Sequence, residues 1–196
     1  MLIKPPVAVD GPDEEPVSLE ETKEFIHVTG NAENYRISAL ITTARLSCEA
    51  ELSQAFITTT FDLYFDAFPA VILLPRNPVQ GVVSISYYDS NGDLQTLDSS
   101  LYRVDLRAVP ARIQPARDAS WPETESDHPN AVIVEFVAGY GDSISSPQIS
   151  SVDSVPENIK TAIKTLVQHL LDQPLSTEIP AAVRVNLYSD HQLFKV

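Results

Sequence analysis

The chain has 196 residues, 43% of them hydrophobic and 20% charged, which is ordinary globular usage and excludes wholesale disorder. Its 13 lysines and arginines against 27 aspartates and glutamates give a formal net charge of −14, which argues against tight, nonspecific binding of duplex DNA. No apolar run reaches the roughly 18–20 residues that cross a bilayer, and the first residues lack the apolar core of a signal peptide, so we expect a cytoplasmic product with no membrane partner.

The N-terminal quarter is predicted to be an arm followed by two helices. Residues 1–16 hold four prolines and several acidic residues without periodicity, which predicts a flexible or extended arm. Ser18, with Glu21 three residues later, forms a capping box and predicts a short helix over 19–27. The longest helix is predicted from residue 32, because apolar residues recur at spacings of three and four. Its stripe consists of Ile37, Leu40, Ile41, Ala44, Cys48 and Leu52.

Cys48 is the single cysteine, so the chain can form no internal disulfide. Its place on the apolar stripe predicts a buried side chain and not a reactive thiol.

The middle of the chain is predicted to be antiparallel β structure. Apolar and polar residues alternate over 56–66, as in a half-buried strand. A short apolar run at 71–74 precedes Pro75-Arg76-Asn77-Pro78, whose prolines predict a corner. Further strands are predicted over 82–88, 94–97, 102–106 and 131–138, with the sequence Asp89-Ser90-Asn91-Gly92 as a hairpin turn.

A second long helix is predicted after the serine-rich loop 142–154, and it should pack on the first because both must bury their apolar stripes. Pro156 suits the first turn, and Pro174 ends the helix. Its buried stripe is predicted to consist of Ile159, Ile163, Leu166, Val167 and Leu170. The last segment has a weaker pattern, typical of one more short helix with Val183, Leu187, Tyr188 and Phe194 as apolar contacts.

These elements predict an α+β fold in which two N-terminal helices plus a C-terminal helix form a small helical core with an antiparallel β-rich insertion. The predicted organisation is an arm over 1–16, a helical core over 17–55 and 155–174, a β-rich insertion over 56–141, a loop over 142–154 and a C-terminal tail over 175–196.

No pattern in the sequence predicts catalysis. The four histidines, His27, His128, His169 and His191, are far apart and show no metal-ligand spacing, and His169 is expected in the core. There is no glycine-rich phosphate loop. Asp62 and Asp66 could share a strand face, as a nuclease would require, but a solvated face is the favoured interpretation. We therefore expect no enzyme, no catalytic residue, no metal site and no cofactor.

Five of the arginines fall in the β region: Arg76, Arg103, Arg107, Arg112 and Arg117. Together they could face DNA or another subunit. For Arg76, Arg103, Arg107 and Arg112, ion pairing with the excess carboxylates of a neighbouring subunit is favoured over a DNA contact, and simple surface charge remains the default interpretation.

The succession of segments over about 17–174 resembles a known family, the phage head-tail connector (adaptor) proteins labelled "uncharacterised phage protein, possible DNA packaging", which also occur in gene transfer agents. The segments that carry this resemblance are VSLEETK (17–23), FDLYFDAFP (61–69), ILLPRNP (72–78), VVSISYYD (82–89), YRVD (102–105), ARI (111–113), FVAGYG (136–141) and VPENIKTAI (155–163).

The resemblance implies a structural subunit that forms a ring, dodecameric like the portal, below the portal of a tailed phage, prophage or gene transfer agent. It would join head to tail and pass DNA without sequence-specific binding. The implied partners are the portal protein, copies of the chain itself and a tail or stopper protein, in the virion neck after assembly in the host cytoplasm.

In such families the C-terminal segment tends to dock on the portal. The candidate portal contacts are accordingly Val183, Leu187, Tyr188 and Phe194, and removal of 180–196 is predicted to abolish portal binding while the monomer stays folded.

Three alternatives remain open from the sequence. The chain could be a head- or tail-completion protein one ring further down, a DNA-packaging nuclease or regulator, or a soluble binding module unrelated to virions.

Overall fold

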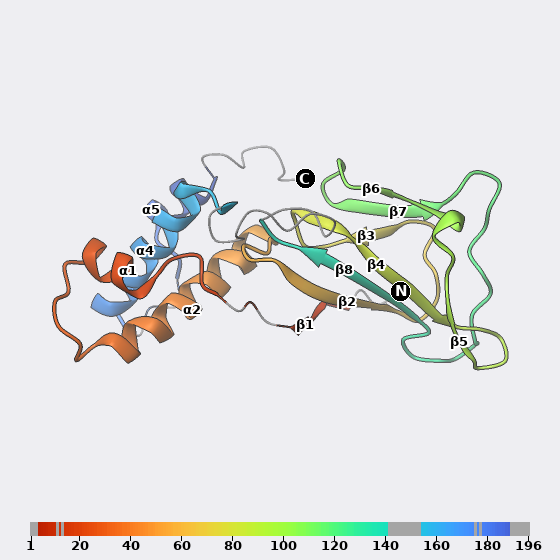
Figure 1. The fold of residues 1–196 in the computed structure, drawn as a ribbon, viewed down its shortest axis with the longest axis horizontal. Coiled ribbons are helices and arrows are strands. Elements are labelled where there is room, and N and C mark those ends of the chain that lie inside the picture. Colours follow the sequence, from red (N-terminus) through yellow and green to blue (C-terminus); the bar gives the residue numbers. More distant parts are fainter. Residues whose placement is uncertain are drawn as a thin grey trace.

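The computed structural model describes residues 4–10, 12, 14–140, 154–174, 176 and 178–188. It has a helical body at one end and a β body at the other (Figure 1). The helices are α1 (Leu19–Phe25), α2 (Asn34–Leu52), α4 (Glu157–Asp172) and α5 (Ala181–Tyr188). In the described part of the chain no helix is both long and apolar enough to cross a membrane. The predicted α+β class is confirmed.

The helical body forms around the predicted apolar stripes. The Ser18 hydroxyl accepts a hydrogen bond from the Glu21 amide at 3.1 Å, so the predicted cap begins α1. α2 packs on α4, which buries Ile37 and Ile41 of α2 and Ile159 and Ile163 of α4 in one core. The prediction that the two long helices flanking the β region pack on each other is confirmed.

Cys48 lies inside this core with no exposed surface. Burial raises the pKa of its thiol from 9.0 to about 12, and the neighbouring carboxylates Glu49 and Glu51 add to the shift. The predicted burial of Cys48 is confirmed. A thiol held neutral at physiological pH is a weak nucleophile.

The β body consists of two sheets. The larger has the order β1-β2-β8-β4-β5, and the smaller has the order β3-β7-β6. All strand pairs are antiparallel. The strands are β1 (Val7–Asp10), β2 (Thr59–Phe65), β3 (Ile72–Leu74), β4 (Val79–Tyr88), β5 (Leu94–Thr96), β6 (Tyr102–Asp105), β7 (Ala111–Pro115) and β8 (Val132–Ala138).

The inner faces of the two sheets share a second hydrophobic core. Phe61 and Leu63 of β2, with Phe136 of β8, face Ile72 of β3 and Ile113 of β7. Residues that alternate with these on the same strands point outward. The two outer faces of the sandwich therefore lie on opposite sides of the β body (Figure 1).

The predicted corner at 75–78 carries the chain from one sheet to the other, since β3 belongs to the smaller sheet and β4 to the larger. The predicted hairpin turn joins β4 to β5, with Gly92 at a φ of +83°, a conformation that glycine adopts easily. Gly139 follows β8 directly at a φ of +135°, and a Cβ there would lie 2.5 Å from the Ile57 backbone.

Two strands were not predicted from the sequence. β1 lies in the segment for which no regular element was expected. It forms by pairing with β2, and in this register Val7 of β1 lies opposite Asp62 of β2. β7 follows Pro110 and ends on Pro115. Because prolines argue against a central strand, no strand was predicted here, although β7 lies in the middle of the smaller sheet.

Candidate assembly faces

The structure brings three of the four candidate inter-subunit arginines together on the smaller sheet. Arg112 of β7 lies between buried Ala111 and Ile113, so it points outward, and its register partner on β3 is the exposed Leu73. Arg103 of β6 lies on the same outer face, two residues from Asp105, which pairs with Arg112. Arg107 lies in the turn between β6 and β7. We call Leu73, Arg103, Arg107 and Arg112 the cationic face.

Exposed apolar side chains lie beside Arg112 in the strand register and beside Arg107 in the β6–β7 turn. Leu73 is 52% exposed, Leu106 44% and Val109 46%. The Arg112 guanidinium forms an ion pair with Asp105 at 3.0 Å, and the hydrogen bond from Arg112 lowers the pKa of the Asp105 carboxyl. Among the described residues, neither Arg103 nor Arg107 has an ion-pair partner. The cationic face thus combines apolar contact area with the positive charges of Arg103 and Arg107, which no carboxylate among the described residues pairs with.

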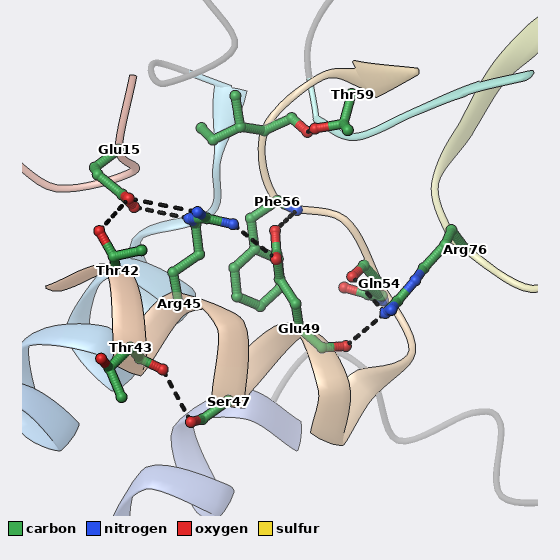
Figure 2. A network of polar contacts seen from close by, with 11 residues as sticks. Glu15, Thr42, Thr43, Arg45, Ser47, Glu49, Gln54, Phe56, Thr59 and Arg76 are labelled. Atoms are coloured by element: carbon green, nitrogen blue, oxygen red, sulfur yellow. Dashed lines mark hydrogen bonds and ion pairs between the residues drawn. The ribbon is translucent and has the colours of Figure 1, made fainter. Parts of the chain in front are cut away.

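Arg76, the fourth candidate, lies elsewhere. Its guanidinium donates to the backbone carbonyls of Glu49 and Gln54, each at 3.4 Å, at the C-terminal end of α2 (Figure 2). The corner at 75–78 turns this side chain toward the helical body. Arg76 therefore joins the two bodies of the same subunit.

Beside Arg76, a buried ion-pair network ties the N-terminal segment to α2 and to the entry of the β body (Figure 2). The Arg45 guanidinium donates to Glu15 at 2.8 Å and to Glu49 at 2.9 Å, and its side chain is only 7% exposed. The second oxygen of the Glu49 carboxylate accepts the Phe56 amide at 2.8 Å. No pattern in the sequence predicts this network, because Glu15 lies in the arm without periodicity.

The pKa values in this network follow from burial and pairing. Burial alone would lower the pKa of Arg45, but its bonds to Glu15 and Glu49 outweigh burial and raise it. For Glu49, burial raises the pKa, although the Phe56 amide and Arg45 oppose the shift. The network holds the helical body to the β body, and its central cation, Arg45, is buried.

The opposite outer face, on the larger sheet, is acidic. Asp62 of β2 and Glu135 of β8 are register partners, so two carboxylates stand side by side. The Tyr64 hydroxyl donates to Asp62 at 2.9 Å, which raises the pKa of that phenol, and the Ser84 hydroxyl donates to Glu135 at 3.2 Å. In the part of the chain that the structure describes, neither carboxylate has a cationic partner. We call Asp62, Tyr64, Ile133 and Glu135 the acidic face.

The alternative interpretation of Asp62 and Asp66 as a nuclease pair finds no geometric support. Asp66 follows β2, where it accepts Lys4 at 2.6 Å and the Asn130 amide at 3.1 Å, and these bonds lower the pKa of its carboxyl. Asp62 faces Glu135 instead. Among the described residues, no group of three or more histidine, cysteine, aspartate or glutamate side chains could hold a metal ion.

The candidate portal contacts are divided by the structure. Val183 and Leu187 of α5 have no exposed surface and belong to the helical core. The Tyr188 hydroxyl donates to Glu51 of α2 at 2.8 Å. Phe194 lies outside the described residues. The side of α5 that remains available carries Val185, which is 69% exposed.

Comparisons with known proteins give structural matches only. No family model and no curated protein sequence matches the chain. A chain in the virion of a native gene transfer agent particle matches with a TM-score of 0.72 and 18% identity, over 94% of this chain and 93% of that one. A chain in the neck of an empty gene transfer agent particle, computed with C6 symmetry, matches with a TM-score of 0.72 and 19% identity, over 95% and 94%.

A third match is a chain in the neck of a native gene transfer agent particle computed with C12 symmetry. Its TM-score is 0.70 and its identity 18%, over 95% of this chain and 94% of that one. At these identities the matches establish a shared fold, and this fold extends over nearly the whole of both chains.

Proposed function

We propose that the chain is a structural adaptor subunit of a neck, which forms a ring below the portal of a tailed phage, prophage or gene transfer agent and joins the head to the tail. The observation that carries this proposal is the fold shared over 94–95% of the chain with proteins of gene transfer agent particles and their necks.

The C12 symmetry of one of these necks supports a dodecameric ring for the proposed subunit. The net charge of −14 supports a passive passage for DNA, because an acidic surface repels phosphate and does not hold the strand in place. As a neck subunit, the protein would be part of the virion after assembly in the host cytoplasm.

The C-terminal segment remains the proposed portal-docking region, but the structure changes how this is tested. Removal of 180–196 would delete α5 and expose the core contacts of Val183 and Leu187, so loss of binding would follow from misfolding alone. A shorter deletion, 189–196, spares α5 and still removes Phe194.

The deciding experiment is a pull-down of the full chain with the portal protein encoded in the same particle gene cluster. We expect the full chain to bind the portal and the 189–196 deletion to lose binding while its thermal unfolding curve is unchanged. Full binding by this variant would contradict portal docking through the tail. Failure of the full chain to bind the portal, together with its presence in a ring nearer the tail, would indicate a completion protein instead.

A further inference from the structure

Positive charge is concentrated in one part of the chain. The segment 101–117 contains four arginines and one aspartate, a net charge of +3, so the remainder of this chain of net charge −14 carries −17. Three of these arginines form the cationic face of the smaller sheet. Twelve or so identical acidic subunits repel one another unless they meet where their charges differ in sign.

The composition of the cationic face fits a protein partner and not DNA. A surface that follows a phosphate backbone gains from lysine and arginine but gains nothing from Leu73, Leu106 and Val109, which are about half exposed here. Arginine interspersed with apolar side chains is typical of the centre of protein interfaces.

The acidic face has the complementary properties. Asp62 and Glu135 stand opposite each other, an arrangement of like charges that destabilises a sheet unless a cation neutralises it. Tyr64 and Ile133 lie beside them on the same outer face and supply apolar area. The described part of the subunit provides no cation for these carboxylates, just as it provides no anion for Arg103 and Arg107.

The two faces also have the right relative position. They are the opposite outer surfaces of one sandwich, since the inner surfaces of both sheets are joined in a single core. A closed ring of identical subunits needs two different, mutually complementary surfaces on roughly opposite sides of each subunit.

We propose that the cationic face of one copy binds the acidic face of the next copy, so that the β bodies stack head to tail around the ring. This inference rests on the proposed function, because it specifies how the ring closes. Arg103 and Arg107 of one subunit would supply the charge that Asp62 and Glu135 of the neighbour lack.

Charge reversal with rescue tests the pairing in the full-length chain. We expect the variant Arg103→Glu with Arg107→Glu, and separately the variant Asp62→Lys with Glu135→Lys, to reduce ring formation at least tenfold, as measured by sedimentation velocity and negative-stain electron microscopy. The chain that carries all four substitutions should recover rings. Arg117→Glu is the matched control, because Arg117 lies in the loop after β7, is 84% exposed and should leave assembly unchanged.

The outcomes separate the two levels of the proposal. The pairing would be overturned if both double variants form rings as readily as wild type. It would also be overturned if the fourfold variant forms no rings although its unfolding curve matches that of wild type. Either result would leave the proposed neck function intact. A wild-type chain that forms no ring at any concentration and is absent from purified particle necks would contradict the proposed function itself.

Discussion

Arg45 in the helical body and Arg103 in the β body carry the same charge in opposite surroundings. Arg45 is enclosed between Glu15 and Glu49, whereas Arg103 lies on an outer sheet face without an ion-pair partner among the described residues. The charge of Arg45 is thus neutralised inside the helical body, whereas the β body presents charges of both signs on two faces without an ion-pair partner among the described residues. We therefore expect substitutions in the buried network around Arg45 to affect folding, and substitutions on the two outer faces of the β body to affect association between subunits.

The largest folding effect is expected for Arg45→Ala. Removal of the guanidinium leaves Glu49, and with it Glu15, partly buried without an ion-pair partner, which should lower the free energy of unfolding by about 3–5 kcal/mol in urea denaturation. Arg36→Ala is the control, because the Arg36 pair with Glu33 is half exposed, and it should cost less than about 1 kcal/mol. Equal losses would remove the distinction between buried and exposed charge.

A slightly smaller effect is expected for Leu187→Ala. Leu187 is fully buried against the helical core, so the cavity should cost about 2–5 kcal/mol. Val185→Ala, two residues away on the exposed side of α5, should change stability by less than about 0.5 kcal/mol. If both variants unfold at the same urea concentration as wild type, α5 is not part of the folding unit, and the longer deletion of 180–196 becomes a valid test of portal docking.

Alkaline pH should weaken the helical body through Cys48. Its pKa rises from 9.0 to about 12 on folding, so in that window the folded chain keeps a proton that the unfolded chain loses. The contribution of this bound proton to the free energy of unfolding is fully present below pH 9.0 and is lost as pH rises toward 12. The loss is about 1.4 kcal/mol for each pH unit within the window. Urea denaturation from pH 7 to pH 10.5 should show a steeper loss for wild type than for Cys48→Ala. Parallel curves would contradict a thiol kept neutral by burial.

The smallest effect is expected at the start of α1. Ser18→Ala removes the hydroxyl that accepts the Glu21 amide and should cost about 1 kcal/mol. Ser38→Ala, at an exposed position of α2, should be neutral or slightly stabilising because alanine favours helix. A loss at Ser38 as large as that at Ser18 would show that the cap makes no specific contribution.

The sequence was most informative where one periodic stripe decides burial. Ile159 and Ile163 of α4, Ile37 and Ile41 of α2, and the alternation along β2 all lie as predicted. Local turn chemistry was also sufficient for the hairpin at Gly92 and the cap at Ser18.

Contacts between distant segments could not be predicted in this way. The order of the strands along the chain does not show that β8 lies between β2 and β4 in the sheet. The pairing of Asp62 with Glu135 therefore follows only from the strand register in the structure. The arginines of the β region looked equivalent in the sequence. The corner at 75–78 nevertheless turns Arg76 toward α2, while β6 and β7 bring Arg103 and Arg112 to one face.

Cryo-electron microscopy of purified particles whose neck contains this chain is the most direct test of the adaptor role. We predict a ring of twelve copies between the portal and the tail, in which the smaller sheet of each subunit faces the larger sheet of its neighbour. Particles in which the chain is absent from the neck, or whose heads join tails normally when its gene is deleted, would contradict that role.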